Sequence, residues 1–313
     1  MIRKLHIREL RTRVMHELAR RRCLADTFSF APEPGGAETV YGLTGAVNAM
    51  AALGVPLGDR ATRQQAAARI LAYRRPDGTF DGGAGPGHGL HMVLGALNLL
   101  GEPIPADLTP LAPTDPTQLP EWLNQHDWGS THKELCGQTI PLLASGRVEA
   151  DWINVFHHEL DARLHAERPM ETWCSADAPA WRVISCVFHV CSAFDAGRLP
   201  YPQPETLMRR VLDLGWDDVS DDAQRTCCTD GDWAFLLLHL CRQLPQYAET
   251  VMPAIRRVSA RRVEAWYADS QGTLNLDTHH LYCFLWSTAV FQGCVRDHYV
   301  GGYLRDTLND PAL

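Results

Sequence analysis

The chain has 313 residues, of which 45% are hydrophobic and 21% are charged, an ordinary balance for a globular protein. Its formal net charge of −8 argues against nucleic acid as a partner. The sequence contains no signal-peptide pattern and no run of about eighteen apolar residues. We therefore expect no transmembrane segment and a soluble, cytoplasmic protein.

A degenerate unit of roughly fifty residues recurs along the chain. Each copy has a loop with Thr or Trp near Gly, Ser or Asp, and an apolar helical segment follows this loop. The copies can be aligned on Thr27, Thr79, Trp128, Thr172, Thr226 and Thr273. Units of this size cannot bury their own apolar faces and must stack on their neighbours. The repeat therefore predicts one domain over residues 1–313.

Six segments are predicted to be amphipathic outer helices, because they are rich in Arg, Glu and Gln and carry apolar residues at helical spacing. They cover residues 5–22, 60–74, 117–125, 150–166, 204–214 and 250–268. The first is basic, but Leu5, Leu10 and Val14 follow the helical period, so we interpret it as a helix and not as a targeting peptide. The proline-rich stretch 101–120 predicts a surface crossing that replaces most of the third outer helix.

Six further segments are apolar nearly all round, which is typical of helices buried on every side. They cover residues 38–53, 89–100, 132–145, 179–195, 231–244 and 278–293. No strand of alternating pattern is predicted. The sequence thus predicts an all-α fold, a single (α/α)6 toroid of six helical hairpins with about twelve helices in two concentric rings.

In such a ring, the loop and first turn of each inner helix lie at one end of a central cavity. The residues at these positions are chemically rich and form the candidate site. They are Glu38, Tyr41, His88, His91, His132, Trp173, Asp177, Trp181, Arg182, Cys228, Asp230, Asp232, Trp233, His279, His280 and Tyr282. We expect one from each repeat to face one end of the cavity: Glu38, His88, His132, Asp177, Asp230 and His279. Asp277 and Thr278 are equally well explained as helix N-caps.

Two apolar segments carry a resemblance to a known superfamily. The stretch DGTFDGG followed by HGLHMVLGALNLLGEP, together with YGLTGAVNAMAALGVP, resembles the repeat of the terpenoid-cyclase and protein-prenyltransferase toroids. The resemblance implies a central-cavity enzyme that acts on an isoprenoid or another largely apolar small molecule. The D-x-D-D motif of the class II cyclases does not occur in the sequence.

Two shorter segments resemble the prenyltransferase β subunit. DGDWAFL (230–236) is similar to its D-G-C-Y-S-F-W segment, and HHLYCFL (279–285) is similar to its H-T-C-Y-C-L segment. The resemblance places Asp230 and His279 at ligand positions of a catalytic zinc, while Asp232 stands where the family has Cys. It therefore implies zinc or another divalent metal held by Asp230, Asp232 and His279, with Cys228 as a further ligand candidate.

The residues leave three functions open. In an isoprenoid enzyme, Trp and Tyr would stabilise cationic intermediates, and Asp230, Asp232 and His279 would bind a metal or transfer protons. In a carbohydrate-active enzyme, which could be a glycoside hydrolase, lyase or epimerase, Trp173, Trp181 and Trp233 would stack on sugars, with Asp177, Asp230 or Glu38 as acid and base. The third function is a non-catalytic toroid that binds a ligand or partner. A deep apolar cavity would favour the isoprenoid enzyme, and a shallow polar cleft with two opposed carboxylates would favour the carbohydrate-active enzyme. A cavity filled by side chains would favour the non-catalytic toroid.

Overall fold

The computed structural model describes residues 3–24, 28–80, 86–103, 105, 112–125, 132–145, 148–164, 178–216, 228–268 and 276–307. These ranges contain twelve α-helices and one sheet of two very short strands, which confirms the predicted all-α class. Among the described helices, none combines the length and the apolar character needed to cross a bilayer.

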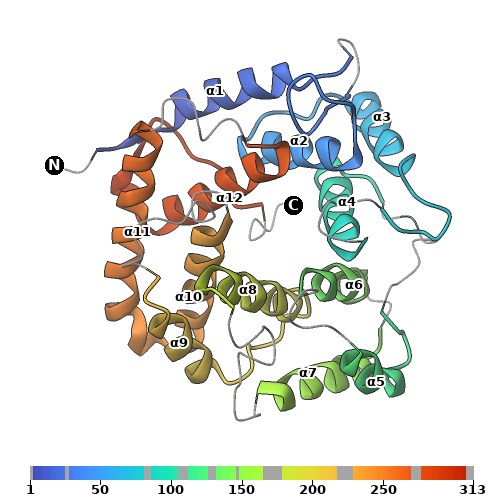
Figure 1. Cartoon of the computed structure of the whole chain (residues 1–313), viewed down its shortest axis with the longest axis vertical. Helices are drawn as coiled ribbons and strands as arrows, with labels where there is room; N and C mark the ends of the chain where they lie inside the picture. Colours follow the sequence, from blue (N-terminus) through green and yellow to red (C-terminus); the bar gives the residue numbers. More distant parts are fainter. Residues whose placement is uncertain are drawn as a thin grey trace.

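Six helices lie at the periphery of the molecule in Figure 1 and correspond to the predicted outer set. They are α1 (Ile7–Arg20), α3 (Arg60–Leu71), α5 (Leu119–Asn124), α7 (Ala150–Leu164), α9 (Pro204–Asp213) and α11 (Ala248–Ala268). Short 3-10 turns precede α5 and α11 and follow α12: η1 (Pro116–Gln118), η3 (Pro245–Tyr247) and η5 (Arg296–His298). The third outer helix is short, as the preceding prolines predicted.

The other six helices form a closed cycle of contacts inside this periphery. They are α2 (Val40–Ala52), α4 (Pro86–Leu100), α6 (His132–Ser145), α8 (Ala180–Ala196), α10 (Asp230–Gln243) and α12 (Thr278–Cys294). Each helix of this inner set contacts the next in chain order, and α12 returns to contact α2. The cycle brings together residues from opposite ends of the sequence (Figure 1).

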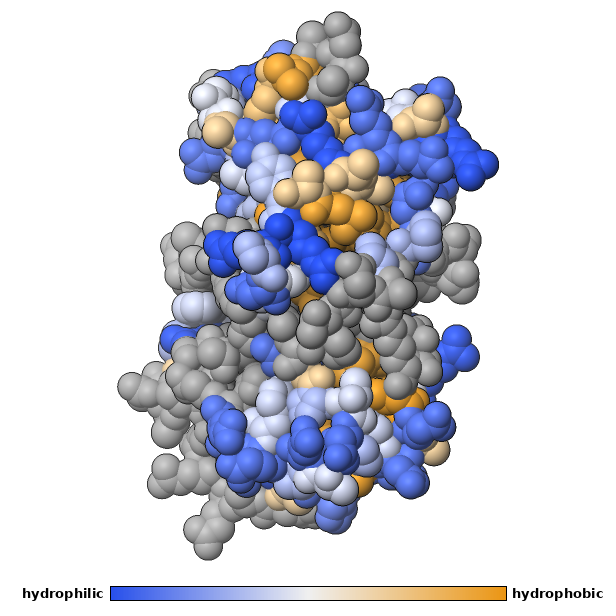
Figure 2. Space-filling model, turned by 90° about the vertical axis from the view of Figure 1, so that its right-hand side faces the viewer, coloured by the Kyte–Doolittle hydropathy of each residue, from blue (hydrophilic) through white to orange (hydrophobic). Residues whose placement is uncertain are grey.

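The burial of the two sets follows their composition. In α3 only Ala66, Ala67 and Ile70 are buried, whereas α12 buries fourteen of its seventeen residues. Burial of one Leu or Phe side chain contributes about 1.5–3 kcal/mol, so the apolar inner helices supply most of the driving force for association. Hydrophilic residues cover much of the face shown in Figure 2, and apolar residues are visible between them.

Polar caps fix where several helices begin. The side chain of Thr39 accepts a hydrogen bond from the backbone N–H of Gly42 at the start of α2 (3.0 Å). At the start of α3, the side chain of Asp59 accepts from the backbone N–H of Thr62. Asp277 caps α12 by accepting from the backbone N–H of His280 (2.8 Å). The N-cap interpretation of Asp277 is therefore confirmed. Such caps satisfy amide groups that have no partner within the helix.

The two ends of the chain meet in a short parallel sheet. Strand β1 (Leu5–His6) pairs with β2 (Tyr299–Val300), with Leu5 opposite Tyr299. The predicted outer helix 5–22 therefore begins at Ile7, because the two residues before it are extended and bonded to β2. After β2 the chain reaches the inner helices, where the Arg305 N–H donates to the carbonyl of Ala52 (2.8 Å).

Candidate functional site

One cavity of about 620 Å³ lies among the inner helices. Three helices contribute most of its wall. On each of them the main lining residues are three or four positions apart, so they lie on one face of the helix, and we call such a row a stripe. The stripes are Ser185, Phe188, Ser192 and Asp195 of α8; Asp232, Phe235, His239 and Arg242 of α10; and His279, Cys283 and Trp286 of α12. His88, His91 and Met92 of α4 and the neighbouring Cys228, His189 and Tyr282 also line it.

The middle of the wall is aromatic. Phe188 lies edge-on to Phe235 with ring centroids 5.5 Å apart, and Trp286 lies 5.4 Å from Phe188 and 5.9 Å from Phe235. These three rings come from three different helices, and we call them the aromatic cluster. They form an apolar zone between two polar ends of the cavity, because Phe188 lies between Ser185 and Ser192 on its stripe and Phe235 lies between Asp232 and His239, while Trp286 packs against both rings.

The first polar end contains several of the predicted residues. The ring centroids of His88 and His279 are 5.1 Å apart, and Tyr41 lies 4.8 Å from His279 and 5.8 Å from His88. The Nε2 atom of His279 is 3.5 Å from the Sγ atom of Cys283, one turn further along α12. Repeats one, two and six thus bring their predicted residues together, and Asp232 from repeat five lines the same cavity.

Burial changes the pKa values of two groups near this end, and the two changes have opposite signs. It lowers the pKa of His91, which favours the neutral imidazole. It raises the pKa of the Tyr41 phenol well above its ordinary value, with a further contribution from Cys283. Both groups are therefore neutral around pH 7, and Tyr41 keeps its O–H proton.

The second polar end contains a carboxylate–imidazole pair that the sequence analysis missed. Asp195 Oδ1 lies 3.1 Å from Nδ1 of His239, and its Oδ2 accepts a hydrogen bond from the hydroxyl of Tyr201 (2.6 Å). The ring of Phe235 stacks on His239 with centroids 4.0 Å apart. His239 follows Asp232 by seven residues, or two helical turns, and so lies on the same face of α10. This spacing could have identified His239 from the sequence.

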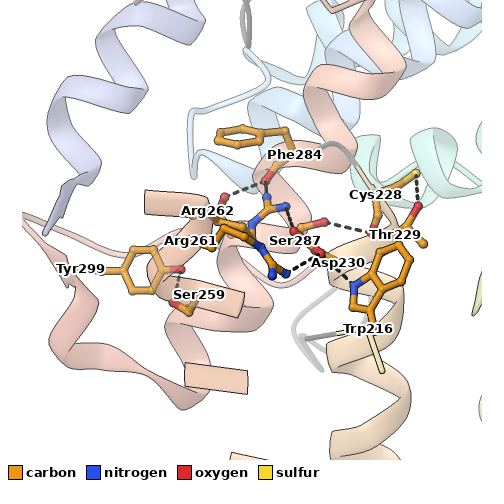
Figure 3. Close-up of polar contacts among 11 residues, drawn as sticks. Trp216, Cys228, Thr229, Asp230, Ser259, Arg261, Arg262, Phe284, Ser287 and Tyr299 are labelled. Atoms are coloured by element: carbon orange, nitrogen blue, oxygen red, sulfur yellow. Dashed lines mark hydrogen bonds and ion pairs between the residues drawn. The ribbon is translucent and has the colours of Figure 1, made fainter. Parts of the chain in front are cut away.

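Asp230 lies outside this cavity, contrary to the prediction. Its Oδ1 accepts a hydrogen bond from Nε1 of Trp216 (2.9 Å), and its Oδ2 is 3.4 Å from Arg262 Nη1 (Figure 3). Arg261 lies 4.0 Å from the same carboxylate. Asp230 is 1% exposed and belongs to a buried ion pair between α10 and α11. The physical reason is helical geometry, since two residues along a helix are about 200° apart around its axis.

This placement bears on the metal that the resemblance implies. Asp230 and Asp232 face different sides of α10, and Asp230 is already neutralised by Arg262. Within the described ranges, no three His, Cys, Asp or Glu side chains are grouped closely enough to hold a metal ion. The proposed set of Asp230, Asp232 and His279 therefore does not fit a shared metal.

Glu38 is also turned away from the cavity lining. Its carboxylate pairs with Nε of Arg69 on α3 (2.6 Å) and accepts from the hydroxyl of Tyr73 (3.0 Å) and from Ser29. These partners hold the chain before α2 against α3. Glu38 is thus part of a polar network between an outer and an inner helix.

The remaining predicted residues fall into two groups. Some have described side chains that do not line the cavity: Trp181 and Arg182 are partly buried, Trp233 is fully buried, and His280 pairs with Asp277 at 3.0 Å. The others lie outside the described part of the structure: Trp173, Asp177 and the side chain of His132, whose backbone begins α6.

The chain was compared with protein-family models, curated proteins and solved structures. No protein-family model, no curated protein and no solved structure matches the chain.

Proposed function

We propose that the closed cycle of inner helices is the inner ring of an (α/α)6 toroid, and that the chain is an enzyme acting on a small, largely apolar molecule of the isoprenoid type. The molecule occupies the cavity between the inner helices. The contacts that return from α12 to α2 support the toroid. The cavity volume of about 620 Å³ is in the range of small-molecule sites.

The aromatic cluster carries this proposal. Phe188, Phe235 and Trp286 converge on the cavity from α8, α10 and α12, where an apolar chain would contact all three rings. Aromatic faces also attract positive charge, which suits cationic intermediates of isoprenoid chemistry. Asp232 and His239 are seven residues apart on one helix, so the polar ends are separated by about 10 Å along the axis. An elongated molecule with a polar end fits this arrangement.

A carbohydrate-active enzyme is the second candidate, favoured by one observation. Two carboxylates, Asp195 and Asp232, both line the cavity, as acid–base cleavage of a sugar would require. The predicted platform Trp233 is 1% exposed and does not line the cavity, which removes one expected sugar-stacking surface.

A binding and turnover experiment separates the candidates. Farnesyl diphosphate and cellobiose are added to the full chain, and the Tm and any product are measured. We expect farnesyl diphosphate to raise the Tm and to be turned over, and Trp286→Phe to reduce the Tm shift. Trp266→Phe is the matched control, because Trp266 is equally buried but stacks on Phe284 outside the cavity.

Each other result contradicts the proposal in a different way. A Tm shift with cellobiose alone would support the carbohydrate candidate. Binding of farnesyl diphosphate without product would support a ligand-binding toroid with no activity. Equal losses in Trp286→Phe and Trp266→Phe would show that the aromatic cluster is not the binding surface.

A further inference from the structure

Helix α8 ends in a turn whose backbone conformation normally belongs to glycine. The N–H groups of Arg198 and Leu199 donate to carbonyls of the last turn of α8 (3.0 and 2.9 Å), which is the bonding pattern of a Schellman cap. Arg198 has a φ of 55° in this cap, whereas α2 and α4 end in the same pattern with Gly54 (φ 66°) and Gly101 (φ 71°). A residue with a Cβ atom is strained in this conformation, so Arg198 stands there at a cost to stability that a role of its side chain would explain.

The cavity is accessible to solvent at the end where Arg198 lies. Arg198 and Arg242, the latter from the last turn of α10, both line the cavity, and both are exposed. At the other polar end, His88, Asp232 and His279 are all buried. A ligand can therefore enter past the two arginines, and we call this end of the cavity the mouth.

The carboxylates nearest the mouth already have partners. Asp195 belongs to the carboxylate–imidazole pair described above. Asp306 lines a neighbouring hollow of about 440 Å³ together with Arg242, and its Oδ1 accepts a hydrogen bond from Nε1 of Trp286 (3.2 Å). Within the described part of the chain, neither Arg198 nor Arg242 forms an ion pair or a hydrogen bond with a carboxylate. Their guanidinium groups thus keep N–H donors for a ligand.

We propose that Arg198 and Arg242 form an anion site at the mouth, and that the ligand of this cavity is an apolar molecule with a carboxylate head. The apolar body packs against the aromatic cluster, and the head stays at the mouth, where the planar guanidinium donors match the two carboxylate oxygens. The nearby charges of Asp195 and Asp306 oppose further negative charge, which favours a singly charged head over a diphosphate. This inference rests on the proposed function for a ligand in the cavity and specifies its head group.

The alternative role of the two arginines is structural, because a cation near a helix C-terminus interacts favourably with the helix dipole. That role predicts that an acid and an alcohol with the same body bind equally well. It also leaves the left-handed conformation of Arg198 unexplained, since a glycine at that position would remove the strain.

The first test compares farnesoic acid with farnesol, which share one apolar body, on the native full chain. Binding is followed by tryptophan fluorescence around neutral pH, where the acid is ionised. We expect the acid to bind about tenfold more tightly than the alcohol, the effect of charge-assisted hydrogen bonds. This advantage should shrink at high salt, because salt screens exposed charges.

The second test uses Arg198→Gly. We expect this variant to raise the Tm by about 1–3 °C, because glycine adopts the left-handed conformation without strain. It should weaken farnesoic acid about three- to tenfold and leave farnesol unchanged. Gln203→Gly is the matched control, because Gln203 also has a positive φ (42°) but does not line the cavity, so both affinities should stay unchanged. Arg242→Gln removes the second charge and should weaken the acid to a similar extent.

The outcomes distinguish this inference from the proposed function. Equal binding of acid and alcohol by the native chain, or an unchanged affinity for the acid in both arginine variants, would overturn the anion site. Tighter binding of farnesyl diphosphate than of farnesoic acid would overturn the carboxylate head. If no farnesyl compound binds, the isoprenoid function fails, and dodecanoic acid and dodecanol replace them as the test pair. Failure of dodecanoic acid to bind as well would overturn the anion site, and this native-chain comparison requires no variant to fold.

Discussion

Asp230 and Asp232 are two residues apart in the first turn of α10, and their side chains serve opposite sides of that helix. Asp230 is paired with Arg262 of α11, and Asp232 lines the cavity. Both carboxylates are also close to the positive end of the helix dipole, which stabilises negative charge there. The two acidic residues look equivalent in the sequence, but we expect their substitution to have different effects on the stability of the protein.

We predict that Asp230→Asn lowers the free energy of unfolding by about 3 kcal/mol, since removal of one partner leaves the buried Arg262 uncompensated. Asn keeps an oxygen for the Trp216 N–H, so the loss reports the charge. The measurement is urea unfolding at pH 7. Asp232→Asn is the control at the same end of the helix, and it should cost less than Asp230→Asn because it leaves the ion pair of Asp230 with Arg262 in place. Equal losses in the two variants would contradict the assignment.

The elements could be predicted from the sequence because helical periodicity is local. The segment 278–293 was predicted as an inner helix, and α12 covers Thr278–Cys294. Strand β1 was not predicted, because its pairing with Tyr299 is a contact between the two ends of the chain that no local pattern encodes.

The site was only partly predictable, for the same reason. His88, Asp232 and His279 were found because they lie at helix starts, where the repeat aligns them. Asp195 and His239 were missed because they lie near the ends of α8 and α10, and their pairing across 44 residues depends on how the two helices pack. In addition, the position at which a helix begins does not determine which of its faces lines the cavity.

Close packing of the ring gives a prediction about two glycines. A Cβ atom on Gly45 of α2 would lie 2.8 Å from Thr278 of α12, whereas a Cβ on Gly293 would meet nothing within 4 Å. We predict that Gly45→Ala destabilises the protein by about 1–3 kcal/mol through overpacking. Gly293→Ala should stabilise it by up to about 1 kcal/mol through helix propensity. Thermal unfolding of the two variants tests this, and a stable Gly45→Ala protein would contradict the contact between α2 and α12.

The cap of α12 gives a prediction about pH. Burial raises the pKa of Asp277, but the hydrogen bonds from the His280 side chain and backbone outweigh it, so the pKa is lowered overall. A carboxyl whose pKa is lower in the folded state stabilises the protein above its unfolded pKa of about 4, and this contribution is lost as the pH falls through the folded value. Asn caps a helix about as well as Asp.

Asp277→Asn should therefore cost roughly 0.5 kcal/mol at pH 7, a value discounted for the partial exposure of the group. The difference from the unchanged protein should shrink as the pH falls through the lowered folded-state pKa of Asp277, and it should be absent at an acidic pH where the carboxyl is protonated in both states. Urea unfolding at the two pH values measures it. A cost that is the same at both would show that the charge of Asp277 contributes nothing.

Cys283 gives a prediction about thiol reactivity. Its Sγ lies 3.5 Å from Nε2 of His279 and lines the cavity, whereas Cys186 of α8 is fully buried and does not line it. The thiolate is the reactive form of cysteine, and an imidazole that accepts the S–H proton increases its share. We predict that iodoacetamide alkylates Cys283 of the native chain and leaves Cys186 unmodified. His279→Gln should slow alkylation of Cys283 about tenfold and leave the exposed Cys23 unaffected. Mass spectrometry of the alkylated peptides gives the three rates in one experiment. A rate at Cys283 that is unchanged in His279→Gln would mean that the contact does not activate the thiol.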